Sequence, residues 1–169
     1  DQWVSGLRTL AAAKPGTGLD ALAEGFGLWC WTLAFINTAK DSLGRPLSQS
    51  QRHGVLFPMV DALCWLLAVR SLVADVRELA EKGPEHPVVG PEIEGYVTTF
   101  TDLAHLQIAR AVGEVGRISA ELVYGYGAAT DEQSTAFQKR RAQMDAALAG
   151  ARLAKDRAAK ALTQIMIPE

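Results

Sequence analysis

Strong net charge of either sign is what this sequence most clearly lacks. Among its 169 residues, 17 lysines and arginines face 19 aspartates and glutamates, so the formal net charge is −2. A dedicated nucleic-acid binder normally carries a strongly basic face, so no nucleic-acid partner is expected. With 49% apolar and 21% charged residues, the composition is that of an ordinary globular protein, neither disordered nor membrane-spanning.

Cysteine is also scarce, since the chain has only Cys30 and Cys64. Nothing resembles the disulfide framework of a small secreted protein, and no zinc-ligand spacing is present. Each cysteine stands in an apolar run that contains tryptophan, which favours a buried free thiol over a disulfide.

Long apolar runs and targeting segments are missing as well. The most apolar run, LWCWTLAFI at residues 28–36, is too short to span a bilayer and is typical of a core helix. The first residues lack a basic stretch leading into an apolar one, so no signal peptide is predicted. We therefore expect a cytoplasmic protein without a membrane partner. The sequence leaves open whether the chain stands alone or is part of a larger enzyme.

Apolar residues recur with a period of about 3.6, which predicts an all-α fold. Breakers such as Pro15, Pro46 and Gly125 separate the periodic segments. Helices are predicted over residues 2–13, 18–42, 48–82, 91–124 and 131–165. We expect these four to five long helices to form one up-and-down bundle domain over residues 1–169.

Several local features refine this prediction. Pro58 lies one or two turns inside the third helix, so a kink or a helix start is expected there. Residues 83–91 are predicted to be a non-helical loop, the longest in the chain. Thr130 and Gln133 have the spacing of a capping box that opens the fifth helix. That helix has a thin, alanine-rich apolar stripe, which suits an outer helix or one that packs against a partner chain.

One face of the predicted fourth helix carries polar side chains three and four residues apart: Gln107, Arg110, Glu114, Arg117 and Glu121. The simpler interpretation is a solvated ion-pair stripe, each pair contributing ~0.2–0.5 kcal/mol. The sharper one is that Arg110 or Arg117 holds an anionic ligand group. Trp65 belongs to a set of aromatics that either form plain core or line an apolar pocket: Trp29, Trp31, Phe57, Trp65 and Phe100. The candidate ligand-binding residues are Trp65, Arg110, Glu114 and Arg117.

A second face of the same helix carries small residues and His105, preceded one turn earlier by Asp102. The small residues Ala109, Gly113, Gly116 and Ala120 would let another helix approach closely. Asp102 could orient His105 for acid–base work, or simply satisfy it in the core. A dimetal bundle needs two acid-x-x-His units and further carboxylates, so with one unit no metal site is predicted.

Asp61 interrupts the long apolar run of residues 55–69. A carboxylate there either points outward, pairs internally with an arginine such as Arg70, or lies in a pocket where burial would raise its pKa. In the last case it could act as a general acid or base. The candidate catalytic residues are therefore Asp61, Asp102 and His105.

Four segments together resemble the helical C-terminal region of bacterial acyl-CoA dehydrogenases: LFPMVDALCWLL (56–67), DLAH (102–105), ARAVGEVGR (109–117) and SAELVYGY (119–126). The resemblance covers about residues 54–127. It implies an all-α bundle that packs in oligomers and that, in complete enzymes, accompanies domains binding FAD and an acyl thioester. The chain has no β-domain and no recognisable flavin site, so no cofactor is expected, and no catalytic residue of the family can be matched.

Two functions follow as hypotheses. The first is a helical module, similar to that C-terminal region, which binds an apolar or acyl-type ligand or supports assembly of an oligomer, most simply a homodimer. The alternative is a small cofactor-independent cyclase, isomerase or lyase that uses Asp61, Asp102 and His105 in an apolar pocket. The alternative requires the three side chains to meet in one enclosed cavity. The predicted helix over residues 18–42, apolar around most of its circumference, either forms the dimer contact or is the central helix of a monomer.

Overall fold

The computed structural model describes residues 2–49 and 51–166 of the chain, and all regular structure in these ranges is helical. The helices are α1 (Gln2–Ala13), α2 (Leu19–Thr38), α3 (His53–Lys82), α4 (Ile93–Tyr124), α5 (Asp131–Ala146) and α6 (Ala151–Met166). Two short 3-10 turns, η1 (Gly83–Glu85) and η2 (Gly90–Glu92), join α3 to α4. The predicted all-α bundle is confirmed.

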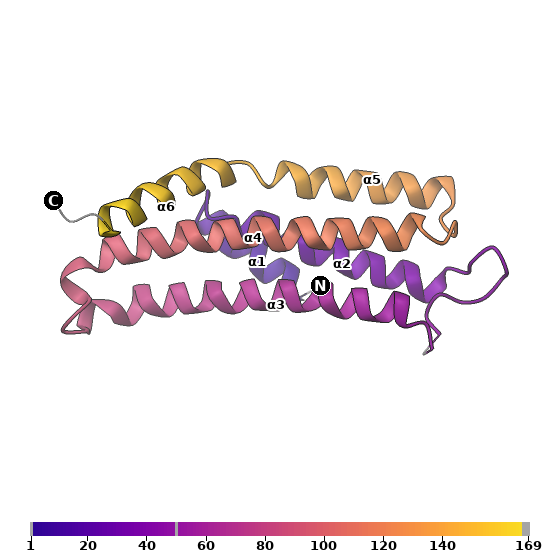
Figure 1. Cartoon of the computed structure of the whole chain (residues 1–169), viewed down its shortest axis with the longest axis horizontal. Helices are drawn as coiled ribbons and strands as arrows, with labels where there is room; N and C mark the ends of the chain where they lie inside the picture. Colours follow the sequence, from indigo (N-terminus) through magenta and orange to yellow (C-terminus); the bar gives the residue numbers. More distant parts are fainter. Residues whose placement is uncertain (1, 50, 167–169) are drawn as a thin grey trace.

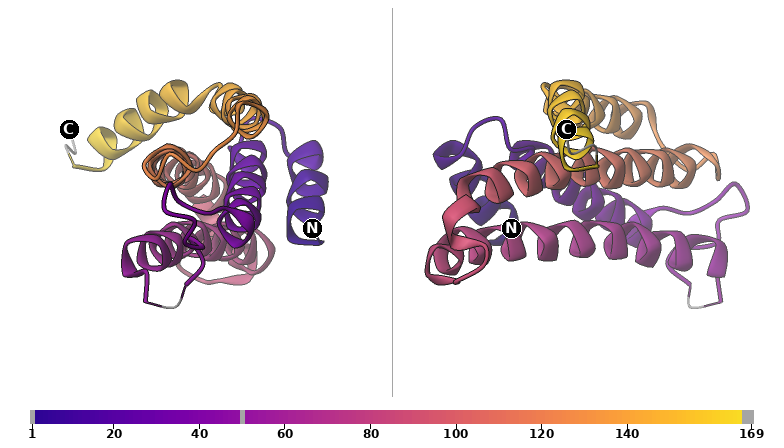
Figure 2. Two further views of the ribbon diagram at one scale, coloured as in Figure 1. Left: turned by 90° about the vertical axis from the view of Figure 1, so that its right-hand side faces the viewer. Right: turned by 60° about the vertical axis from the view of Figure 1, so that its left-hand side comes forward.

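The long helices run alternately up and down, with α3 and α4 forming a hairpin along the length of the molecule (Figure 1). Helix α2 packs against α1, α3, α4 and α5 and is the central helix. Helix α1 lies on the outside of α2 (Figure 2), while α5 and α6 follow one another along α4 (Figure 1). Helix α2, predicted over residues 18–42, therefore has the central position within the chain.

The core is built from side chains that recur on one face of each long helix. Helices α2 and α4 supply most of it, and Ile108, Val112, Val115 and Val123 of α4 are each 0% exposed. Leu22 and Leu28 of α2 and Val55 and Leu66 of α3 meet this face; all four are buried. Burying each such side chain contributes ~1.5–3 kcal/mol, so this layer dominates the stability of the bundle.

Helix α2 ends at Thr38, four residues before its predicted end, because the chain turns sharply after it. Lys40 and Pro46 form an isolated antiparallel bridge around the turn. Inside the turn, the Asp41 carboxylate accepts hydrogen bonds from the guanidinium of Arg52 and from the backbone N–H groups of Leu43 and Arg45. These contacts, the Arg52 contact above all, hold the pKa of Asp41 well below its usual range. These contacts stabilise the chain reversal, so α2 does not continue beyond Thr38.

The predicted fifth helix is in fact two helices, which corrects the expectation of one helix over residues 131–165. Gly150 has a φ of 88° and ends the turn that separates α5 from α6. The start of α5 agrees with the prediction, since Thr130 and Gln133 form the complete capping box. The predicted loop at 83–91 is also corrected in part, because it contains η1 and most of η2.

The prediction of buried thiols is wrong, because Cys30 and Cys64 are both exposed and unbridged in the described part of the chain. In α3 the reason is that the first half of the helix is apolar on two opposite faces. Val55, Met59 and Leu66 face the core, whereas Cys64 lies on the other side. Apolar neighbours in the sequence therefore did not imply burial.

Helices α2 and α3 are both long and apolar enough to cross a membrane by length and composition alone. The most apolar window of α2 is 56% buried, as expected of a core helix, whereas that of α3 is only 28% buried. Helix α3 therefore leaves apolar surface uncovered.

Candidate functional site

A buried polar centre lies where α4 meets α6. Arg157 of α6 donates two hydrogen bonds to the Asp102 carboxylate of α4, from Nε to Oδ2 at 2.9 Å and from Nη2 to Oδ1 at 2.5 Å. The Asp102 side chain is only 8% exposed, whereas that of Arg157 is 55% exposed. Hydrogen bonding to the carboxylate raises the pKa of Arg157 above its ordinary value. This bidentate salt bridge attaches α6 to the bundle.

His105 lies one helical turn after Asp102 and is 1% exposed. The turn between α1 and α2 covers one side of its ring, because a Cβ at Gly18 would come within 2.5 Å of the imidazole Cδ2. The turn between α5 and α6 covers another side, since a Cβ at Gly150 would lie 3.8 Å from Cε1. Gly18 has a φ of 81°, so both the backbone and the imidazole require glycine there.

The environment of His105 favours its neutral form. Burial lowers the pKa of the imidazole most strongly, and the Arg157 guanidinium lowers it further; the Asp102 carboxylate and the Gly16 backbone oppose this. Neither ring nitrogen has a hydrogen-bond partner of normal geometry among the described residues. The neutral ring therefore behaves mainly as a packing element between three segments of the chain.

Asp102 and His105 are brought together, but Asp61 is not brought to them. Asp61 is exposed on α3. In the antiparallel α3–α4 hairpin, Trp65 lies beside Arg110, and Val73 lines the same cleft as Ala104. These two pairs set the register of the hairpin and place Asp102 about 12 to 14 residues along α3 from Asp61, a separation of roughly 20 Å. Asp61 has no salt bridge with Arg70 among the described residues; the Arg70 guanidinium instead lies 4.6 Å from the centroid of the Trp3 ring.

The predicted ligand-binding residues separate into two surface contacts. The Arg110 guanidinium lies over the Trp65 ring, 5.3 Å from its centroid, a cation–π arrangement. Arg117 donates to Glu114 at 3.0 Å and to Glu121 at 2.7 Å, and these bonds raise its pKa, the Glu114 bond most. Arg117 is 55% exposed, so its contacts match the simpler interpretation, a solvated ion-pair stripe.

The face of α4 that carries the predicted small residues is packed against side chains of α5 at one position. A Cβ at Gly116 would meet the ends of Arg141 and Met144 of α5, at 2.8 Å. A Cβ at Gly113 would meet nothing within 4 Å among the described residues. Gly116 therefore makes room for α5, while Gly113 serves no close packing.

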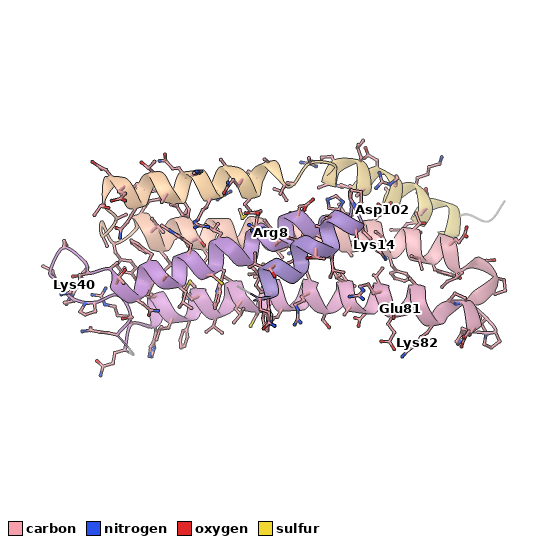
Figure 3. The ribbon with its side chains drawn as sticks, turned by 180° about the vertical axis from the view of Figure 1, so that it is seen from behind. Arg8, Lys14, Lys40, Glu81, Lys82 and Asp102 are labelled. Atoms are coloured by element: carbon pink, nitrogen blue, oxygen red, sulfur yellow. The ribbon has the colours of Figure 1, made fainter. Side chains whose placement is uncertain are left out.

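A small apolar cleft of about 60 Å³ lies beside the polar centre, between the end of α1, the start of α2 and the α3–α4 hairpin. The residues that line it are Leu10, Lys14, Thr17, Leu19, Val73, Val76, Arg77, Ala80, Val97, Thr101 and Ala104. Lys14 and Arg77 are exposed and supply two positive charges at its rim. Figure 3 labels Lys14, at the end of α1, and Asp102 of α4 toward the same end of the bundle.

A larger and more open groove of about 650 Å³ runs between the first half of α4 and α6. Tyr96, Phe100 and Leu162 give it an apolar floor, whereas Glu92 and Glu94 give one end negative charge. The candidate aromatics do not gather in one pocket. Phe100 lines this groove, Phe57 is 65% exposed, and Trp29 donates its Nε1 hydrogen to the Met59 carbonyl at 2.9 Å.

No cluster of three or more His, Cys, Asp or Glu side chains that could hold a metal ion occurs in the described residues. Comparisons with models of known protein families, with curated proteins and with solved structures find no match for this chain.

Proposed function

We propose that the chain is a binding module, which takes the end of an apolar or acyl-type ligand into the cleft between α1, α3 and α4. The observation that carries this proposal is an apolar cleft with two cations at its rim. Val73, Val76 and Val97 form its walls, and Lys14 and Arg77 stand at its opening. An amphiphile with an anionic end matches this distribution of groups.

The size of the cleft limits what enters it. One water needs ~10–15 Å³ on this measure, and a cavity of about 150 Å³ holds benzene. A cleft of about 60 Å³ therefore accepts the last few carbon atoms of a chain, with the rest of the ligand lying along the surface. The groove between α4 and α6 is larger, but Glu92 and Glu94 at its end would repel an anionic group.

The charges at the rim favour an anionic head group over a neutral one. Arg77 Nη2 lies 3.7 Å from Glu81 Oε1 on the same helix. A contact of this length between exposed charges contributes little to stability. Its guanidinium can therefore turn to a carboxylate or phosphate at low cost. Acyl thioesters of coenzyme A combine such phosphates with an apolar chain, which agrees with the resemblance in the sequence.

The alternative enzyme hypothesis lacks support from this arrangement. It needs Asp61, Asp102 and His105 in one cavity, yet Asp61 is exposed roughly 20 Å away. Asp102 and His105 do not line any of the clefts described above. We therefore assign Asp102 and His105 to the architecture that shapes the cleft.

Calorimetric titration of the purified chain with octanoate and with octanoyl-CoA tests the proposal. We expect both to bind, octanoyl-CoA more tightly because it carries more negative charge. Val76→Trp should fill the cleft and weaken binding about tenfold or more, or ~1.4 kcal/mol. Val88→Trp is the matched control, because Val88 is 77% exposed and lies outside the cleft. If either probe fails to bind, or if Val76→Trp binds the probes as tightly as the native chain does, the proposal is overturned.

A further inference from the structure

The outer face of the first half of α3 is apolar and uncovered. Phe57 is 65% exposed, Val60 57% and Leu67 36%, and the exposed Cys64 lies between them. The core residues of the same helix lie on its opposite side. The views in Figures 1 and 2 show α3 at the edge of the bundle, with no described helix against its outer side.

The exposed residues follow the spacing of a coiled-coil seam. Phe57, Val60, Cys64 and Leu67 are separated by three, four and three residues, and the exposed Ser71 and Ala74 continue the series by four and three. This alternation is the a/d pattern by which one helix packs against another through knobs and holes. All six residues are uncharged. The geometry therefore suits a second helix better than a flat surface.

We propose that this seam, defined as Phe57, Val60, Cys64, Leu67, Ser71 and Ala74, binds the same seam of a second copy of the chain in antiparallel orientation. The seam is large at one end and small at the other. An antiparallel pair places Phe57 opposite Ala74 of the second copy, and Val60 opposite Ser71. Large side chains then meet small ones, and the contact is self-complementary about a two-fold axis. A parallel pair would oppose Phe57 to Phe57 and leave a gap at Ala74.

The surrounding charges agree with a protein partner. Asp61, Asp75 and Glu78 are exposed near the seam, and they would repel the anionic surface of a bilayer. In the antiparallel pair, Asp61 is level with Arg70 of the second copy, and the nearest position on the flank that it faces is Ala68, so it does not meet another acid. This charge distribution favours a second copy over a membrane as the occupant.

The size of the seam predicts a reversible dimer. The eighteen residues of helix from Phe57 to Ala74 span about 26 Å, and a helix face is about 10 Å wide. Such a strip is smaller than the ~800 Å² per partner of a standard stable interface. We therefore expect monomer and dimer to exchange with concentration. The seam lies opposite the core side of α3, so this inference does not depend on ligand binding in the cleft.

Sedimentation analysis over a wide range of concentrations, under reducing conditions, tests the self-association. The native chain should shift from monomer to dimer, and Val60→Glu should weaken the dimer about tenfold or more. Val88→Glu is the matched control: the same residue type, 77% exposed, on the loop after α3. Because Val60 is exposed, its variant should keep the native melting temperature. A native chain that stays monomeric, or a Val60→Glu chain that dimerises like the control, would overturn the proposal.

Cross-linking tests the antiparallel orientation separately. In a background of Cys30→Ser and Cys64→Ser, one preparation carries Val60→Cys and another carries Ser71→Cys. With diamide as the two-electron oxidant, a mixture of the two should form a disulfide-linked dimer, and neither alone should do so. Cross-linking of each preparation with itself would show a parallel pair, and absence of cross-linking in the mixture would show that the seams do not meet; both results contradict the proposal.

Discussion

Asp102 and Arg157 are 55 residues apart in the sequence, and their side chains meet through two hydrogen bonds, at 2.9 Å and 2.5 Å. The pair joins α4 to α6 beside the buried ring of His105. Because the carboxylate is buried and the guanidinium half-exposed, the two partners do not contribute equally. Removing the arginine leaves a buried charge without a partner, which is the costlier loss.

Replacing Arg157 by Met should loosen α6 before it affects the rest of the bundle. The buried side chains in the described part of α6 are small, Ala154 and Ala158, so the ion pair carries much of its attachment. We expect amide hydrogen exchange in α6 to accelerate by about tenfold or more, with α2 unchanged. Arg152→Met, an exposed arginine in the same helix, is the control. Adding Asp102→Asn should recover part of the loss, and equal exchange in the two single variants would refute the role of the pair.

Stability should fall as the pH drops below about 6.5, and His105 should account for much of this fall. The pKa of His105 in the folded chain lies below its ordinary value, so between the two values the unfolded chain binds more protons. Stability is therefore complete above the unfolded pKa and decreases towards the folded one, by at most ~1.4 kcal/mol per pH unit. Urea unfolding at several pH values measures the slope. His105→Gln should reduce it, while His53→Gln, at an exposed position, should leave it unchanged.

Gly18→Ala should destabilise the chain by about 2–4 kcal/mol, from a left-handed backbone and a crowded site together. The added methyl would come within 2.5 Å of the His105 ring, and the φ of 81° is unfavourable for alanine. Gly27→Ala, inside α2, is the contrasting control. It meets nothing within 4 Å among the described residues, so it should stabilise by ~0.5–1 kcal/mol. Equal shifts in melting temperature would contradict the packing at His105.

Both thiols should react in the folded chain. Cys30 and Cys64 are exposed, so Ellman's reagent should modify each within roughly tenfold of its rate in the urea-unfolded chain. Cys30→Ser and Cys64→Ser should each retain one reactive thiol. The measurement belongs at low concentration, because the proposed dimer would cover Cys64. A native chain with no fast-reacting thiol would support burial instead.

Local sequence signals predicted most of the helix ends. The first predicted helix, 2–13, matches α1, and the capping box at Thr130 and Gln133 opens α5 as expected. The break between α5 and α6 was missed, because a single glycine between alanine-rich segments gives no strong breaker signal. Only the left-handed backbone of Gly150 reveals the turn. Local energetics thus determine where most of these helices begin and end.

The candidate site was predicted in part, for the same reason. The spacing of Asp102 and His105 placed them together within one helix. Their partner Arg157 could not be found, because nothing local links positions so far apart. The cleft was equally hidden, since Lys14 directly follows α1 while Val76 and Val97 come from α3 and α4. Exposure of Cys64 escaped prediction because periodicity indicates that a face is apolar, but not which of two apolar faces is buried.

The two turns that cover His105 differ in which substitutions they tolerate. At Gly150 an added Cβ would be in ordinary contact, 3.8 Å from the ring, so only the handedness of the backbone selects the residue. Asparagine and aspartate tolerate that handedness best among chiral residues, so either of them can replace the glycine at position 150. At Gly18 the ring itself occupies the space, and any change requires a simultaneous change at position 105. One turn is thus free to evolve alone, while the other can evolve only together with the histidine.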